Sequence, residues 1–159
     1  MLNQDVPWSG RGKNFQSFEF GLDPWYDDDD YIEKQLDMIK TDFDLVLISD
    51  YYFESLVLLK NELCMDWSDM YVPPTKIKDY NHLVLSETQV TQFEQFFKQD
   101  VRLFREFNTT FWARVETYGK SRMEADVRYL KLLYLQCAKN PLLEQCSSKG
   151  ADSQERGFP

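Results

Sequence analysis

The sequence predicts an α/β fold that is mostly helical, with one short parallel strand at residues 43–49. The strand is predicted because a short, continuous apolar run begins at Phe43, a pattern typical of a strand covered on both faces. The run leads directly into a helix whose apolar side would carry Phe53, Leu56, Val57, Leu59 and Leu63. A buried strand that continues into a helix is half of an open α/β unit, and the predicted fold class rests on this pair.

The composition predicts a folded, acidic protein. Of its 159 residues, 43% are hydrophobic and 16% are aromatic, which is enough to fill the core of one domain. The net charge of −9 and a pI near 4.6 argue against nucleic acid or an acidic membrane as a partner, because both need a basic surface. No stretch approaches the roughly 20 apolar residues of a membrane span, and the first residues lack the apolar core of a signal peptide. Taken alone, these features predict a soluble, cytosolic protein.

We expect one domain, at residues 14–146. Residues 1–13 are polar, contain Pro7, Gly10 and Gly12, and are expected to form an irregular lead-in. The tail at residues 147–159 is small and polar, and we expect it to be disordered.

Two elements are expected before the strand. Residues 14–24 alternate Phe with polar residues, which predicts either a short strand or an extended segment packed on the core. From Asp28 to about Thr41, apolar residues recur at helical spacing, namely Ile32, Leu36 and Ile39.

The acidic run at residues 27–30 lies where this helix would begin. Carboxylates at a helix start meet free backbone N–H groups and the positive end of the helix dipole. A calcium site is the sharper alternative, but the run lacks the spaced oxygen ligands, the glycine and the terminal Glu of an EF-hand loop. We therefore predict a helix start.

Further helices are expected after a connector at residues 64–81, where Pro73 and Pro74 exclude a helix. Ser86 and Gln89 form a capping box that begins the next helix. Its wide aromatic stripe is predicted to be core, because such a stripe is more often core than a ligand site. The stripe consists of Val90, Phe93, Phe97, Val101 and Phe104, with Phe96, Leu103 and Phe107 beside it.

The carboxyl-terminal part is predicted to stay helical. Asn108 is expected either to interrupt the preceding helix or to begin another, which would end at Gly119. A last helix is predicted at about residues 122–138 and ends before Asn140-Pro141. Its inward residues would be Met123, Val127, Leu130, Tyr134 and Cys137.

Few residues point to catalysis. His82, the only histidine, could be a general base, but a lone loop histidine is more often solvated. The segment Gly10-Arg11-Gly12-Lys13 lacks the preceding strand and the Gly-Lys-Ser/Thr helix start of a phosphate loop. Asp50 follows the predicted strand and could face a crevice, although capping of the next helix is the more common use of Asp there.

Two features depend on the cellular compartment. Cys64, Cys137 and Cys146 show no metal-ligand spacing and would be buried thiols, or would form a disulfide if the compartment is oxidising. Asn108-Thr109-Thr110 is an acceptor sequon for N-glycosylation, which matters only in the secretory pathway.

Several blocks of the sequence resemble the galactose 3-O-sulfotransferase family, which includes the galactosylceramide sulfotransferases. They are Phe18-Glu19-Phe20-Gly21-Leu22-Asp23, then residues 43–60 with Leu63-Cys64, then residues 103–112 (LFREFNTTFW), extended by Tyr118-Gly119 and Arg122-Met123. The resemblance runs from about Asn14 to Leu135, and its two longer blocks are specific.

The resemblance implies a partial sulfotransferase domain of P-loop-like type. Family members move a sulfonate group from 3′-phosphoadenylyl sulfate to the 3-hydroxyl of galactose on a glycolipid or glycan. They do so without an expected metal, in the Golgi lumen. Their membrane anchor and donor-binding loops are expected upstream of the first matching block and are absent from this chain, so catalytic and donor-binding residues stay unassigned. Glycosylation of Asn108 follows from the lumenal location that the resemblance implies.

Two hypotheses follow. Either the chain is the carboxyl-terminal part of such a sulfotransferase and is inactive alone, or it is a non-catalytic interaction domain that retains only the scaffold.

Overall fold

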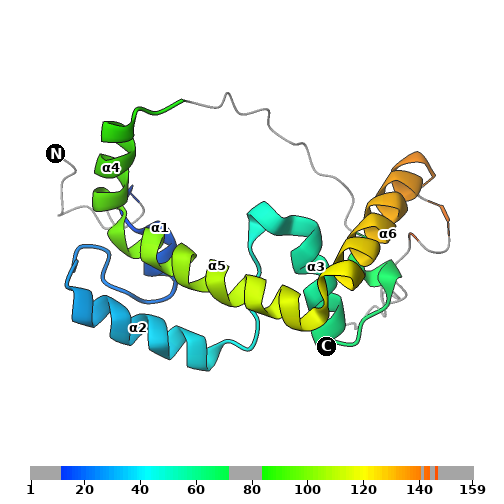
Figure 1. Cartoon of the computed structure of the whole chain (residues 1–159), viewed down its shortest axis with the longest axis horizontal. Helices are drawn as coiled ribbons and strands as arrows, with labels where there is room; N and C mark the ends of the chain where they lie inside the picture. The colour runs from blue at the N-terminus through cyan, green and yellow to red at the C-terminus, as the bar shows by residue number, and fades with distance from the viewer. Residues whose placement is uncertain (1–11, 72–83, 141, 144–145, 147–159) are drawn as a thin grey trace, which may run out of the picture. The chain divides into compact units, whose positions relative to one another are not determined.

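The computed structural model describes residues 12–71, 84–140, 142–143 and 146, and it is helical (Figure 1). The helices are α1 (Phe15–Glu19), α2 (Asp29–Asp42), α3 (Tyr52–Glu62), α4 (Glu87–Phe96), α5 (Lys98–Tyr118) and α6 (Lys120–Lys139). Two 3-10 helices, η2 (Ser49–Tyr51) and η3 (Trp67–Met70), flank α3. The chain forms two compact units, unit 1 with Met1–Val46 and Tyr80–Trp112, and unit 2 with Leu47–Asp79 and Ala113–Pro159.

The prediction of an α/β fold with a parallel strand at residues 43–49 is wrong. No residue of the described part of the chain is in a strand, and this segment is irregular. Its backbone is extended at Phe43 and Ile48, but an extended segment becomes a strand only when a neighbouring strand satisfies its backbone. At Ile48 the Ser55 hydroxyl satisfies the backbone in place of a neighbouring strand. It accepts a hydrogen bond from Ile48 N at 3.0 Å and donates one to Ile48 O at 2.9 Å.

Residues 14–24 also differ from the prediction. They form the short helix α1 and a turn, rather than a strand or an extended segment. The helix begins after Asn14, whose φ of 47° lies in the left-handed region that Asn tolerates better than most residues.

The core of unit 1 lies between α2 and the first half of α5, which run side by side in Figure 1. The predicted helix at about residues 28–41 is confirmed as α2, and its three periodic apolar residues are buried. The core cluster comprises Leu22, Ile32, Leu36, Ile39, Leu103 and Phe107.

The aromatic stripe is only partly core. Its α5 members Leu103 and Phe107 are buried, whereas Phe93 is 53% exposed on α4. Helix α4 ends at its C-cap residue Phe97, which has a ψ of 36°, and α5 begins at Lys98. Helix α5 runs through Asn108, so the prediction that Asn108 interrupts a helix or begins one is wrong. Helix α5 ends before Gly119, as predicted, where a φ of 99° favours glycine.

Unit 2 packs α3 against α6 (Figure 1). The predicted last helix is confirmed as α6. Of its predicted inward residues, Met123, Val127, Leu130 and Cys137 are buried, whereas Tyr134 is only half-buried. On α3 the predicted apolar side is only partly right. Val57 is buried as expected, but Leu58 is buried too and Leu63 is 60% exposed.

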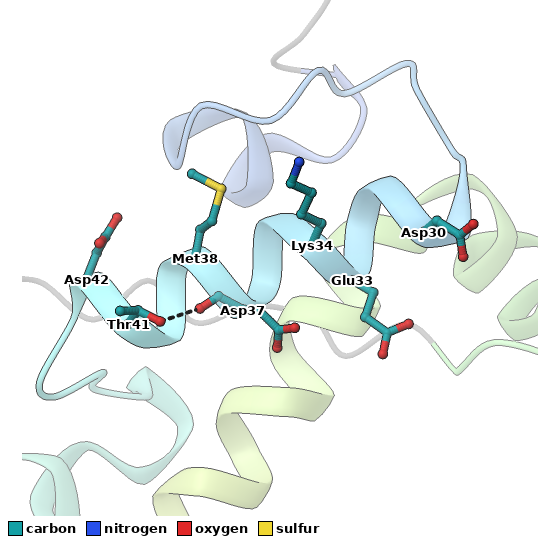
Figure 2. A pocket seen from close by; sticks show the side chains of 7 residues that line it. All are labelled: Asp30, Glu33, Lys34, Asp37, Met38, Thr41 and Asp42. Atoms are coloured by element: carbon teal, nitrogen blue, oxygen red, sulfur yellow. Dashed lines mark hydrogen bonds between the residues drawn. The ribbon is translucent and has the colours of Figure 1, made fainter.

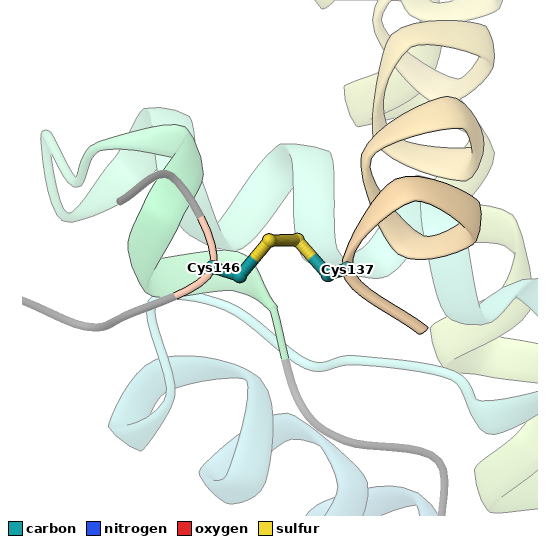
Figure 3. The surroundings of a disulfide bond; sticks show 2 residues. All are labelled: Cys137 and Cys146. Carbon is teal, nitrogen blue, oxygen red and sulfur yellow. A yellow bond between two sulfur atoms is a disulfide. The ribbon is translucent and has the colours of Figure 1, made fainter. Parts of the chain in front are cut away.

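A disulfide links Cys137, near the end of α6, to Cys146 (Figure 3). The two Cα atoms are 5.4 Å apart, within the usual range for a disulfide. Cys64 is a free, exposed thiol. Within the part of the chain that the structure describes, no helix has the length and apolar character needed to cross a membrane.

Candidate functional site

A cluster of polar side chains in unit 1 lies where the amino termini of α1 and α5 meet. The side chain of Asn14 precedes α1 but caps α5, because its Oδ1 accepts from Gln99 N at 3.2 Å and from Asp100 N at 3.4 Å. In return, Asp100 in the first turn of α5 caps α1, accepting from Ser17 N at 2.8 Å, Ser17 Oγ at 2.7 Å and Gln16 N at 3.2 Å. We call this arrangement the reciprocal cap. It satisfies amide N–H groups that a helix leaves unpaired at its start.

Two buried amides extend the reciprocal cap into the loop after α1. Asn14 Nδ2 donates to Pro24 O at 2.9 Å, and Gln99 Nε2 donates to Asp23 O at 2.7 Å and Tyr26 O at 3.0 Å. Asn14 and Gln99 are both 0% exposed. Gln99 Oε1 is buried and accepts no hydrogen bond from the described residues, and an ordered water molecule is the usual partner of such an oxygen.

Three cations surround the cluster, and each binds a carboxylate. Lys13, with a side chain only 8% exposed, pairs with Asp27 and lies 5.3 Å from the Trp25 ring centroid. Asp29 Oδ1 forms salt bridges with Lys98 Nζ at 2.9 Å and with Arg102 Nη1 at 2.7 Å. The hydrogen bond and charge of Lys98 hold the pKa of Asp29 below its usual value, and Arg102 acts in the same direction.

This cluster does not fit a phosphosulfate group. An anion at such a place would need free cations and open helix amino termini. Here Lys13, Lys98 and Arg102 already bind Asp27 and Asp29, while protein oxygens occupy the first turns of α1 and α5. The arrangement therefore holds α1, α5 and the loop between α1 and α2 together, and its three cations are paired within the protein.

A polar groove of about 340 Å³ lies between α2 and α5. Three residues that line it form ion pairs, since Lys40 Nζ lies 2.8 Å from Glu106 and 3.2 Å from Asp37. The hydrogen bond to Glu106 raises the pKa of Lys40 above its usual value. Arg105, which also lines the groove, binds Glu94 at 2.6 Å. The cations of this groove are therefore paired with carboxylates of the protein as well.

The outer face of α2 is acidic (Figure 2). Asp30, Glu33, Asp37 and Asp42 surround a shallow hollow of about 550 Å³ with Lys34, Met38 and Thr41. Thr41 Oγ1 donates to Asp37 O at 2.9 Å, the bond drawn in the figure. Among the described residues, no group of three or more His, Cys, Asp or Glu side chains is arranged to hold a metal ion.

The acidic run at residues 27–30 begins α2, as predicted. Asp28 is the N-cap residue, and its Oδ1 accepts from Tyr31 N at 2.9 Å. The capping box at Ser86 and Gln89 is likewise confirmed at the start of α4.

The other sequence candidates do not come together. Asp50 is exposed in η2 and does not cap α3, whose N-cap residue is Tyr51 without a side-chain capping bond. Asn108 is half-buried in the middle of α5. His82, Gly10 and Arg11, as well as Pro73 and Pro74 of the predicted connector, lie outside the described residues.

Sequence reasoning missed the residues that organise this cluster. Asn14 lies more than 80 positions from Gln99 and Asp100 along the chain, so no local pattern joins them. One local signal was present, since Asn before a short helix and Asp in a first turn are both typical of helix starts.

Comparison with known proteins identifies relatives over most of the chain. A family model described as galactose-3-O-sulfotransferase matches residues 11–155. Galactosylceramide sulfotransferase of Mus musculus is 33% identical over 121 residues, which cover 75% of this chain and 29% of the mouse protein. The Homo sapiens protein of that name is 31% identical over 121 residues, with the same shares covered.

A further relative is galactose-3-O-sulfotransferase 3 of Bos taurus. It is 31% identical over 122 residues, which cover 76% of this chain and 27% of the bovine protein. The chain therefore spans less than a third of the length of these relatives. No solved structure matches the chain.

The reciprocal cap predicts a large effect of removing its carboxylate. Asp100→Ala should lower the free energy of unfolding by about 1–3 kcal/mol, because it removes the acceptor of two backbone N–H groups and a buried hydroxyl. Asp100→Asn should lower the free energy of unfolding less, since the amide oxygen can still accept a hydrogen bond. Urea denaturation followed by circular dichroism measures both. The matched control is Asp42→Ala, an exposed carboxylate of the same unit. An equal effect of the two alanine substitutions would contradict this role of Asp100.

Proposed function

The chain belongs to the galactose-3-O-sulfotransferase family, and from this premise we propose that it is part of an enzyme that sulfonates the 3-hydroxyl of galactose. The observation that carries the proposal is the family match over residues 11–155. A galactosylceramide sulfotransferase and a galactose-3-O-sulfotransferase are both among the relatives, so the acceptor is a galactosyl lipid or a galactose-ended glycan.

The proposed donor is 3′-phosphoadenylyl sulfate, and its binding site would lie outside the described residues. The pairing of Lys13, Lys98 and Arg102 supports a donor site elsewhere, because each of these cations already binds a carboxylate. The role of the chain would be to complete the catalytic domain. A non-catalytic interaction domain is the less favoured hypothesis, since the family match extends over nearly the whole chain.

The proposed location is the lumenal side of the Golgi membrane, where an enzyme of this kind would be anchored by a segment outside the described residues. The disulfide between Cys137 and Cys146 supports an oxidising compartment, because cytosolic thiols are kept reduced. The sequon at Asn108 is compatible with such a location.

A chimera tests the proposed activity. This chain should replace the 121 matched residues of mouse galactosylceramide sulfotransferase and leave sulfonate transfer to galactosylceramide measurable. The 159-residue chain alone should show no transfer. Transfer of radiolabelled sulfonate from 3′-phosphoadenylyl sulfate is the measurement, with glucosylceramide as the control acceptor. A folded chimera without transfer to galactosylceramide would argue against the proposed function.

Glycosylation of Asn108 tests the proposed compartment. Protein secreted from mammalian cells should gain mobility on glycosidase treatment, and Asn108→Gln should abolish the shift because it removes the acceptor amide. The neighbouring threonines give a matched pair of controls. Thr110→Ala destroys the sequon and should abolish the shift, whereas Thr109→Ala leaves the sequon intact and should retain it. Unmodified wild-type protein would contradict the proposed glycosylation of Asn108, which is half-buried in α5.

A further inference from the structure

Helix α4 exposes an apolar face. Every residue from Val84 to Phe96 is exposed. Val90 is 43% exposed, Phe93 53% and Phe96 39%. An aromatic side chain contributes most to stability when it is buried, so a face of this kind on one short helix indicates a contact surface.

The exposed face belongs to a well-formed helix. At its start, Gln89 N donates to Ser86 Oγ at 3.4 Å, and Ser86 N donates to Gln89 Oε1 at 2.9 Å. Toward its end, Glu94 binds Arg105 of α5 at 2.6 Å, and Lys13 Nζ lies 5.7 Å from the Phe96 ring centroid. These contacts lie within unit 1 and fix the direction in which α4 presents its apolar face.

The face contains a shallow groove of about 480 Å³ without a charged lining residue. Phe93, Phe96 and Phe97 form its apolar part, and Gln89 and Gln92 supply uncharged amides at its side. The rings are held together, since Phe93 stacks on Phe97 at 5.6 Å and Phe96 meets Phe97 edge-on at 4.9 Å between centroids. We call these five residues the α4 groove. An uncharged aromatic groove fits an apolar polypeptide surface rather than a phosphate or a sugar acid.

We propose that the α4 groove is the surface against which the donor-binding part of a galactose-3-O-sulfotransferase domain packs. The inference rests on the proposed function. Helix α4 lies inside the family match at residues 11–155, so it belongs to the domain itself. The match covers only 29% of the mouse relative, which leaves most of that protein available to pack against this surface. A second copy of the chain is a poorer occupant, because two chains of net charge −9 repel each other.

The test is binding in trans. The 159-residue chain is mixed with the part of mouse galactosylceramide sulfotransferase that lies outside the matched residues, and complex formation is followed by size-exclusion chromatography with light scattering. The two polypeptides should elute together. Phe93→Asp should weaken the complex at least about tenfold, as is typical of a buried aromatic anchor. Phe93→Leu, which retains an apolar side chain, should weaken it much less.

The control is Leu135→Asp, a charge introduced at a side chain of α6 that is 60% exposed and outside the groove. It should leave the complex unchanged, and the melting temperatures of all variants should match the parent chain. No co-elution, or equal loss with Phe93→Asp and Leu135→Asp, would overturn the inference. Self-association of the chain that Phe93→Asp abolishes would overturn it as well, because the occupant would then be a second copy. A complex that depends on Phe93 but transfers no sulfonate would support the inference and contradict the proposed function.

Discussion

The reciprocal cap between Asn14 and Asp100 is the interaction on which unit 1 depends. Each residue supplies the acceptor oxygens that the other residue's helix lacks at its amino terminus, so neither helix start is satisfied alone. Gln99, between Lys98 and Asp100, ties the loop after α1 to the same place, and Lys98 and Arg102 bind Asp29 at the start of α2. The first turn of α5 thus fixes the positions of α1, the following loop and α2. The buried apolar contacts of α2 and α5 then complete the unit.

Two local signals in the sequence were reliable, whereas signals that needed a distant partner were not. The periodicity of Ile32, Leu36 and Ile39 and the capping box at Ser86 each lie within one helix, and both predictions are confirmed. The apolar run after Phe43 lacked the second strand that would make it part of a sheet, and no local pattern shows whether such a partner exists. Helix α1 depends on Asp100, which is 83 residues away from Ser17. In the aromatic stripe, spacing identified a face but not what covers it, and the structure leaves Phe93 exposed.

The pairing of cations with carboxylates in unit 1 also has a consequence for donor binding. In the cluster at the start of α5, the cations that could attract an anionic donor bind carboxylates of unit 1 instead. We therefore propose that this chain acts as a structural lobe of a protein of this family. Its polar groups organise its own helices, while its uncharged aromatic residues face outward on α4. A lobe of this kind would contribute to catalysis by positioning the rest of the domain.

The most direct test of this account is calorimetric titration of the 159-residue chain with adenosine 3′,5′-bisphosphate, the desulfonated form of the proposed donor. Because the cations around the reciprocal cap are already paired, the account predicts no heat of binding at ligand concentrations up to about 1 mM, which corresponds to less than about 4 kcal/mol of binding free energy. Saturable binding in the micromolar range would contradict it, because the chain itself would then hold the donor site.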